Sequence, residues 1–315
     1  MSATRAGSPA GREGQTFDGE SALARWASFV KLPHTVFALP FALVGVVLAS
    51  RLPVGEGPGT RAPLTLVMVG WVVLAFTAAR WVAMAVNRIV DREYDARNPR
   101  TAMREIPRGV IGVGAAWGTV VVAAALFFLA AAMLNPLCLA LSPIALGWVS
   151  FYSFTKRFTR YAHLVLGLGL AIAPVGGYLA VTGAWSEPWW MLIALTIGVM
   201  TWSAGFDILY ALPDIAFDRS QGLHSIPAAL GIPRAIIVSR ALHCVTVSAL
   251  ALAVWVTGLG GAAWIGVAAV AALLAYEHSL VSSDDLSKLD AAFFTMNGVI
   301  SMAFLASVLV DRWLA

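Results

Sequence analysis

The sequence predicts an all-α integral membrane protein with nine transmembrane helices bundled around a central cavity. Of its 315 residues, 59% are hydrophobic and only 12% are charged, whereas a soluble domain carries about a quarter charged residues. Apolar stretches of about the length that crosses a bilayer recur along almost the whole chain. The formal net charge of +4 does not indicate nucleic-acid binding, because the basic residues fall in short segments between apolar stretches.

Nine spans follow from these stretches, and most are long enough as helices to cross about 30 Å of hydrocarbon. Their expected ranges are 33–50, 64–87, 109–133, 136–153, 162–183, 188–210, 233–257, 261–280 and 290–310. Residues 1–20 are polar and rich in small residues, so we expect a disordered cytoplasmic tail. Residues 21–315 would then form a single membrane domain. Cys138 and Cys244 both fall within apolar spans and indicate no disulfide framework.

The distribution of basic residues predicts the orientation of these spans. Most of the 21 Lys and Arg residues lie before the first span or in the connections after the second, fourth and sixth spans. Cytoplasmic loops carry an excess of Lys and Arg. We therefore expect a cytoplasmic N-terminus and a C-terminus on the other side of a bacterial inner membrane. Because the same connections carry nearly all the polar chemistry, the site should face the cytoplasm.

Two pairs of acidic residues stand out at the ends of predicted spans. Asp91 and Asp95 end the second span, and Asp214 and Asp218 follow the sixth with the same spacing. This faint internal repeat predicts two tandem four-helix units plus one further helix, with the two pairs facing each other across a cavity. On a continuous helix, Asn87 would share one face with Asp91 and Asp95.

The second acidic motif is longer, since Asp207 and Tyr210 precede Asp214 and Asp218 at helical spacing, although Pro213 could kink or end that helix. Stacked carboxylates repel one another, and Mg²⁺ typically binds one or two carboxylates together with phosphate oxygens and water. The metal ligands predicted from both motifs are Asn87, Asp91, Asp95, Asp214 and Asp218. The alternative is that they are solvated loop acids, but ionisable groups at the ends of membrane helices are usually functional.

Basic residues lie in the connections close to these acids. Arg100 and Arg104 follow the first motif, and Lys156 and Arg157 follow the fourth span. Arginine binds diphosphate oxygens through paired hydrogen bonds and lysine binds them as a point charge. All four are therefore candidates for diphosphate binding. The alternative is that these basic loops only set the topology.

Taken together, these motifs resemble those of the UbiA superfamily of intramembrane prenyltransferases. In the first motif of that family, N-D-x-x-D-x-x-x-D, this chain has Arg88 in place of the first aspartate. The second motif and the Y-x-x-x-K-R segment are matched by Asp207, Tyr210, Asp214, Asp218, Tyr152, Lys156 and Arg157. The chain is similar to 4-hydroxybenzoate polyprenyltransferases. Arg88, the opening segment Leu-Pro-His-Thr-Val-Phe-Ala-Leu-Pro at 32–40 and Gly-Leu-His-Ser at 222–225 also resemble a UbiA-like branch often linked to menaquinone biosynthesis.

The resemblance implies transfer of a polyprenyl group from polyprenyl diphosphate to an aromatic acid in ubiquinone or menaquinone biosynthesis. Mg²⁺ and the basic residues would stabilise the leaving diphosphate, and Tyr210 would shield the allylic cation. Asp207 would orient the acceptor or remove its proton. Lys31 and His34 are candidates for binding the acceptor carboxylate. The polyprenyl tail would lie in an apolar groove open to membrane lipid.

Several alternatives remain open at this point. Within the family, the acceptor could be a naphthoate or a futalosine-type menaquinone precursor. A membrane transporter would place its charged groups nearer the midplane. A CDP-alcohol phosphotransferase needs D-G and A-R steps that the acidic motifs lack. A purely structural protein would not need paired acidic motifs. The remaining histidines, including His163, His243 and His278, show no metal-ligand spacing and are assigned no role.

Overall fold

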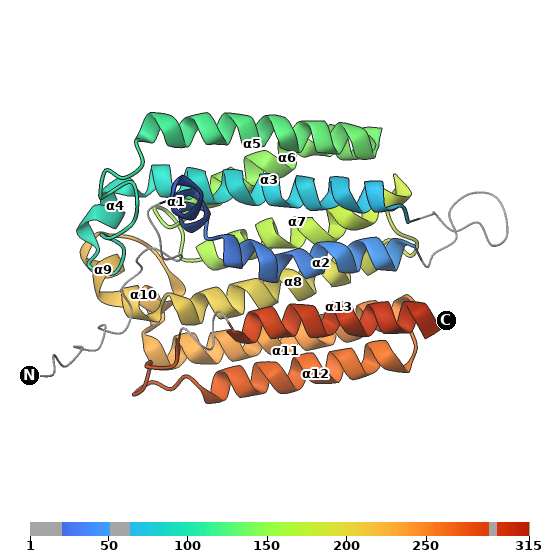
Figure 1. Ribbon diagram of the computed structural model, residues 1–315. Helices are drawn as coiled ribbons and strands as arrows, with labels where there is room; N and C mark the ends of the chain where they lie inside the picture. Colours follow the sequence, from blue (N-terminus) through green and yellow to red (C-terminus); the bar gives the residue numbers. More distant parts are fainter. Residues whose placement is uncertain (1–20, 51–63, 290–294, 315) are drawn as a thin grey trace, which may run out of the picture.

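The computed structural model describes residues 21–50, 64–289 and 295–314, and every long element in these ranges is a helix (Figure 1). The predicted tail, 1–20, lies outside the described residues. The helices are α1 (Ala22–Phe29), α2 (Leu32–Ala49), α3 (Leu66–Val90), α4 (Arg92–Arg97), α5 (Val113–Leu134), α6 (Pro136–Thr155), α7 (Ala162–Thr182), α8 (Trp190–Tyr210), the 3-10 helix η1 (Leu212–Asp214), α9 (Ile215–Ser220), α10 (Ile226–Leu230), α11 (Ile232–Val256), α12 (Gly261–Ser279) and α13 (Asn297–Leu314). The predicted all-α class is confirmed.

Eight of these helices are long and apolar enough to cross a membrane, namely α3, α5, α6, α7, α8, α11, α12 and α13. They correspond to eight of the nine predicted spans, so the chain is an integral membrane protein. The first predicted span, 33–50, coincides with α2, in which Ala38–Ala49 is a shorter apolar helix. The count of nine spans therefore stays a prediction. The last span was predicted to end at 310, but α13 continues to Leu314, and Asp311 in this last turn is buried and accepts hydrogen bonds from the Gly260 and Ala263 amides at the start of α12.

The packing of the bundle is centred on α8, the most deeply buried of the eight membrane helices. It lies between α7 and α11, while α2 packs against α7 and α13. Small residues permit the close helix contacts, because a Cβ atom on Gly167 would collide with the backbone of Met200, and one on Gly177 would collide with the backbone of Ala42. These two glycines are packing residues.

The short helices α4, α9 and α10 gather at one end of the bundle, while the C-terminal end of α13 lies at the other (Figure 1). Helices α3 and α8 run into the short helices α4 and η1. Helix α6 ends at Thr155 and is followed by the basic loop, in which the Lys156 carbonyl accepts a hydrogen bond from the His224 amide just before α10. The fold therefore brings both acidic motifs and the basic loop after α6 to the same end of the bundle.

Candidate active site

A cavity of about 290 Å³ lies at this end of the bundle, lined by residues of α2 to α9 and of the segments between them. All the predicted site residues whose side chains are described lie in its wall. They are Lys31, Asn87, Asp91, Asp95, Arg100, Arg104, Lys156, Arg157, Asp207, Tyr210, Asp214 and Asp218. The side chain of His34 lies outside the described part of the chain. The expectation that the two acidic pairs meet at one cavity is therefore met.

The first acidic motif does not lie on one continuous helix, contrary to the sequence prediction. Helix α3 ends at Val90, and Asp91 caps it before α4 starts at Arg92. The turn is nevertheless close to helical, since the Asp91 amide donates to the Asn87 carbonyl and the Asp95 amide donates to the Asp91 carbonyl. The Asn87 side-chain amide donates to Asp91 Oδ2 over 2.9 Å. The three side chains thus still face one cavity.

The second motif is also interrupted, at the proline that the sequence identified. Helix α8 ends at Tyr210, Pro213 lies in η1, and α9 carries Asp218. Proline fixes its own backbone and lacks an amide donor, so it fits the start of a new helical segment better than the interior of one. Because the chain turns here, Asp207 stays in α8 while Asp214 and Asp218 lie in the segment beyond it.

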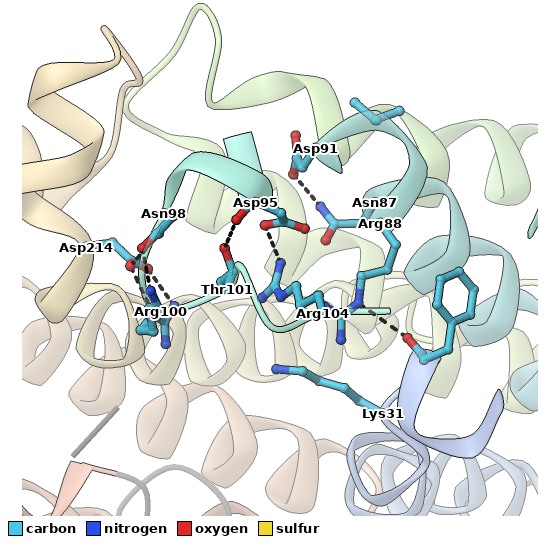
Figure 2. Close-up of polar contacts among 12 residues, drawn as sticks. Lys31, Asn87, Arg88, Asp91, Asp95, Asn98, Arg100, Thr101, Arg104 and Asp214 are labelled. Atoms are coloured by element: carbon cyan, nitrogen blue, oxygen red, sulfur yellow. Dashed lines mark hydrogen bonds and ion pairs between the residues drawn. The ribbon is translucent and has the colours of Figure 1, made fainter. Parts of the chain in front are cut away.

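Three of the four acidic residues of the two pairs form an ion pair with an arginine, and Figure 2 draws two of these pairs, Asp95 with Arg104 and Asp214 with Arg100. Arg104 Nη1 lies 2.7 Å from Asp95 Oδ1, and Arg157 Nη2 lies 3.0 Å from Asp91 Oδ1. Arg100 forms two hydrogen bonds with Asp214, of 2.9 and 2.5 Å. Such charge-assisted bonds are among the strongest that side chains make. The predicted basic residues and the predicted acidic residues therefore hold each other in place.

Two further side chains that the sequence reasoning missed complete this network. Asn98 donates to Asp214 over 3.1 Å and also accepts a hydrogen bond from the Arg100 amide. Ser225 donates to Asp218 over 2.8 Å and caps α10 by accepting from the Ala228 amide. Both are neutral loop residues next to a charged motif, and their spacing alone carries no signal of a role.

The acidic residues suit an ion that arrives with its substrate better than a closed protein site. Among the described residues, no three His, Cys, Asp or Glu side chains stand close enough together to form a ready-made metal site. Mg²⁺ usually takes only one or two carboxylates and fills its remaining positions with phosphate oxygens and water. Asp91, Asp95, Asp214 and Asp218 line one cavity at its polar end, and this donor set fits that mode of binding.

The electrostatics of the cavity reflect this crowding of opposite charges. Burial and the neighbouring Asp95 raise the pKa of Asp91 to about 6, against the opposing effect of Arg157 and other cations. Burial by itself lowers the pKa of the Lys156 ammonium, but the surrounding carboxylates, led by Asp218 and Asp207, outweigh burial and raise it above its ordinary value. Lys156 is therefore a stable positive charge among the acids.

Arg88 occupies a position that is an aspartate in the first motif of the UbiA family. A hydrogen bond of its side chain holds two segments of the chain together. Its side chain is buried, and its Nε donates to the Phe29 carbonyl over 3.3 Å (Figure 2). This bond ties α3 to the end of α1, next to the turn that starts α2. The substitution of a carboxylate by Arg88 therefore removes one possible metal ligand and adds an anchor for the N-terminal segment.

Tyr210 lies between two of the predicted substrate-binding cations. Lys31 Nζ donates to the Tyr210 hydroxyl over 3.3 Å, and the guanidinium of Arg100 lies over the Tyr210 ring at 4.7 Å from its centre. Lys31 has a left-handed backbone with φ 47° at the start of α2, which directs the chain from α1 into the bundle. The ring of Tyr210 thus already acts as a surface for cations.

Arg80 is a cavity residue to which the sequence analysis assigned no role. It lies on α3, about two turns before Asn87, and lines the cavity. Its Nε is buried without a hydrogen-bond partner, and no described residue forms an ion pair with its guanidinium. A charge inside a membrane helix is costly and is usually kept for function. This cost is the signal by which Arg80 could have been found.

A second, apolar chamber of about 340 Å³ adjoins the first cavity and shares Phe76, Ala79 and Phe127 with it. Its walls come from α2, α3, α5, α6, α7 and α8 and are almost entirely hydrophobic, with Gly176 and Cys138 among them. The two spaces together join a charged end to an apolar interior. That combination suits a ligand with an anionic head and a hydrocarbon tail.

His163 also belongs to the site, although the sequence reasoning gave it no role. It is fully buried near the start of α7, and its Nδ1 lies 2.6 Å from Oδ2 of Asp207 on α8. Asp207 itself faces the cavity, with 21% of its side chain exposed. The partner of His163 lies on another helix, so no spacing in the sequence could reveal this contact.

The protein is an all-helical membrane bundle, and its cavity joins paired acidic and basic side chains to an apolar chamber. This is the architecture of an intramembrane enzyme that acts on an amphiphilic anion. The sequence profile of the UbiA prenyltransferase family matches residues 38–305. The chain therefore belongs to the UbiA prenyltransferase family. The family match agrees with the resemblance seen in the motifs. It decides against the transporter and phosphotransferase alternatives.

Known relatives and solved structures support this assignment. The chain is 30% identical over 241 residues to the 4-hydroxybenzoate octaprenyltransferase of Citrobacter koseri, covering 75% of this chain and 81% of that protein. It is 30% identical over 238 residues to the enzyme of the same name from Alkalilimnicola ehrlichii, with 75% and 80% covered. The apo structure of a UbiA homologue from Aeropyrum pernix K1 superimposes with a TM-score of 0.78 at 33% identity, covering 88% of this chain and 98% of that one. A UbiA homologue from Archaeoglobus fulgidus bound to GPP and Mg²⁺ has the same fold, with a TM-score of 0.68 at 21% identity over 92% of this chain and 99% of that one.

Proposed function

We propose that this protein transfers a polyprenyl group from polyprenyl diphosphate to an aromatic acid of the 4-hydroxybenzoate type, with Mg²⁺ as cofactor. The observation that carries the choice of acceptor is Arg80, a guanidinium in the cavity wall without an ion-pair partner among the described residues. An aromatic acid offers such a group its carboxylate. The relatives named 4-hydroxybenzoate octaprenyltransferase make this acceptor the first candidate.

The diphosphate would bind at the polar end of the cavity. Mg²⁺ held by Asp91, Asp95, Asp214 and Asp218, with Asn87 supporting Asp91, would supply charge stabilisation of the leaving diphosphate. Arg100, Arg104 and Arg157 now pair with these carboxylates. With the carboxylates holding the cation, these arginines would be available to phosphate oxygens. Lys156 lies among the same acids and adds a fixed positive charge.

The polyprenyl tail would extend from the polar end into the apolar chamber. A hydrocarbon chain is stabilised by removal from water, at about 25 cal/mol for each Å² buried. The chamber walls shared with the cavity, at Phe76, Ala79 and Phe127, give the tail a continuous path. The reacting carbon would then lie near Tyr210 and Asp207, between the diphosphate and the acceptor.

The reaction begins as the bond between prenyl C1 and oxygen breaks, with its electron pair leaving on the diphosphate. The ring of Tyr210, which already lies against Arg100, would stabilise the allylic cation through its π-face. An aromatic carbon of the acceptor forms the new bond to C1. The proton on that carbon passes to Asp207, and its bonding electrons restore the aromatic ring. Lys31 and His34 remain candidates for assisting Arg80 with the acceptor carboxylate.

The orientation in the membrane belongs to the same proposal. The basic residues of the chain concentrate at the site end of the bundle, as cytoplasmic segments do. We therefore place the N-terminus and the site at the cytoplasmic face. The C-terminal end of α13, which lies at the other end of the bundle (Figure 1), would be on the opposite face.

The test is an acceptor panel with purified protein in liposomes, labelled polyprenyl diphosphate and Mg²⁺. Labelled product with 4-hydroxybenzoate is the expected result, and product only with a naphthoate or a futalosine-type acid would move the proposal to menaquinone biosynthesis. Arg80→Met should raise the KM for the acceptor at least about tenfold, because a charge-assisted bond is worth roughly 1.5–3 kcal/mol. An unchanged acceptor KM in this variant would refute the role of Arg80.

A further inference from the structure

We infer that His163 is a positioning residue that fixes the carboxylate of Asp207 toward the acceptor, an inference that rests on the proposed function above. The two side chains meet across the contact between α7 and α8, with His163 Nδ1 2.6 Å from Asp207 Oδ2. His163 is fully buried and does not line the cavity, whereas Asp207 does. Any effect of His163 on the substrate therefore passes through Asp207.

The surroundings of His163 favour one arrangement of its protons. Its Nε2 is buried and has no hydrogen-bond partner in the described residues. An N–H group left without an acceptor in such a place is costly. An aspartate carboxylate accepts hydrogen bonds, so the short contact is one in which the ring donates from Nδ1 to Asp207 Oδ2.

This bond leaves the other oxygen of Asp207 for chemistry. Oδ2 is held by His163, and Oδ1 accepts no hydrogen bond from any described residue while the side chain keeps 21% of its surface exposed. A carboxylate on a free side chain would rotate about its terminal bond. With Oδ2 fixed from behind, Oδ1 points into the cavity, where it can take the proton that the aromatic ring loses after the carbon–carbon bond forms.

The competing explanation is that the pair only holds α7 to α8. Hydrogen bonds between membrane helices do stabilise packing, by about 0.6 kcal/mol on average. However, α7 and α8 already pack closely through Gly167 and Met200, and a bond used only for packing would not need a partner that faces the cavity. The chain provides a matched control in His243, also a buried histidine against α8, which contacts the Trp202 carbonyl over 3.3 Å and lines neither cavity.

The experiment compares His163→Leu, His163→Asn and His243→Leu in the full-length protein in liposomes. His163→Leu should lower kcat for transfer to the aromatic acid by about tenfold to a hundredfold, with the KM for prenyl diphosphate unchanged. His163→Asn should recover most of the loss, because its side-chain amide places a donor near the position of Nδ1. Cleavage of prenyl diphosphate by water without acceptor, which breaks the same C1–O bond, should be unaffected. Wild-type kcat in His163→Leu, equal losses in all three variants, or a parallel loss of cleavage would overturn the inference.

A spectroscopic measurement separates this inference from the proposed function. The infrared carboxylate band of Asp207, obtained as the difference between wild type and Asp207→Asn, should shift in His163→Leu and return in His163→Asn. His243→Leu should leave it in place. This readout needs no turnover, so it stands even if the wild type transfers to no acceptor tested. A band that does not respond to His163→Leu would contradict the positioning role.

Discussion

Arg100, from the loop after the first acidic motif, forms two hydrogen bonds of 2.9 and 2.5 Å with Asp214 of the second motif. The two residues come from different halves of the chain, so this pair joins the halves at the site (Figure 2). The same guanidinium lies over the ring of Tyr210. One side chain therefore couples the second acidic motif to the residue that would face the reacting carbon.

Loss of the Arg100–Asp214 ion pair should weaken the binding and cleavage of prenyl diphosphate. Arg100→Gln removes a charge-assisted interaction worth roughly 1.5–3 kcal/mol, so we expect kcat/KM for prenyl diphosphate to fall by about tenfold to a hundredfold. Steady-state transfer assays measure this directly. Arg97→Gln is the matched control, since Arg97 is an exposed arginine of the preceding helix that does not line the cavity and donates to Gln221 over 3.3 Å. Equal activity of Arg100→Gln and Arg97→Gln would contradict the role of Arg100.

The reaction should need a higher Mg²⁺ concentration at low pH. Burial and Asp95 raise the pKa of Asp91 to about 6, so a proton occupies this carboxylate at pH values where an ordinary aspartate is charged, and it competes with the cation. We expect the Mg²⁺ concentration for half-maximal transfer to rise as the pH falls below about 6. The folding stability of the metal-free protein should depend on pH in the opposite sense, with low pH favourable. The folded chain holds this proton more tightly than the unfolded chain, so stability decreases as the pH rises from about 4 to about 6.

Titration of activity with Mg²⁺ at two pH values, one on each side of about 6, checks this prediction. Asp91→Asn serves as the control, because it has no carboxylate to titrate at this position. It should need more Mg²⁺ than wild type near neutral pH, and its half-maximal Mg²⁺ concentration should depend less on pH. The account of Asp91 fails if wild type needs the same Mg²⁺ concentration at both pH values.

The apolar chamber should limit the length of the prenyl group. Gly176 lines the chamber, and an added Cβ there would meet no atom within 4 Å. Gly176→Phe should therefore fill space without displacing the backbone, and we expect transfer from octaprenyl diphosphate to fall at least about tenfold while geranyl diphosphate stays a good substrate. Gly147→Phe is the control, since Gly147 also has open space but lines neither cavity. Equal losses with both chain lengths would argue against a tail in this chamber.

Two adjacent glycines should differ sharply in their effect on stability. A Cβ on Gly177 would collide with the Ala42 carbonyl, whereas one on Gly176 would meet nothing. Overpacking of this kind costs typically 1–3 kcal/mol, so Gly177→Ala should lower the thermal unfolding temperature of the detergent-solubilised protein and Gly176→Ala should not. If both variants unfold at the wild-type temperature, α2 and α7 do not pack as closely as described.

The sequence allowed the fold to be predicted well because membrane spans depend on local composition. Eight predicted spans correspond to membrane-length helices, and Pro213 ends a helix as its backbone chemistry requires. The break at Asp91 was missed, since helical spacing alone gives no reason to end α3 before a polar residue. The cavity residues were found because charge is costly at the end of a membrane helix.

The partners of those residues could not be predicted in the same way. Arg100 meets Asp214, and His163 meets Asp207, across distances in sequence that no spacing rule covers. Arg80 was visible as a charge within a span, but only the structure places it in the cavity without an ion-pair partner among the described residues. The sequence thus identified which residues are chemically unusual, and the fold was needed to show which of them meet.

The most direct measurement of the central claim is prenyl transfer by purified protein with and without the carboxylate of Asp214 in the second acidic motif. In liposomes with labelled polyprenyl diphosphate, 4-hydroxybenzoate and Mg²⁺, we predict labelled lipid-soluble product with wild type and with the control Glu93→Gln, whose carboxylate is exposed on α4. Asp214→Asn should lose at least about a hundredfold in kcat/KM, and chelation of Mg²⁺ should abolish transfer. Wild-type transfer by Asp214→Asn, or undiminished transfer in the presence of chelator, would contradict the account.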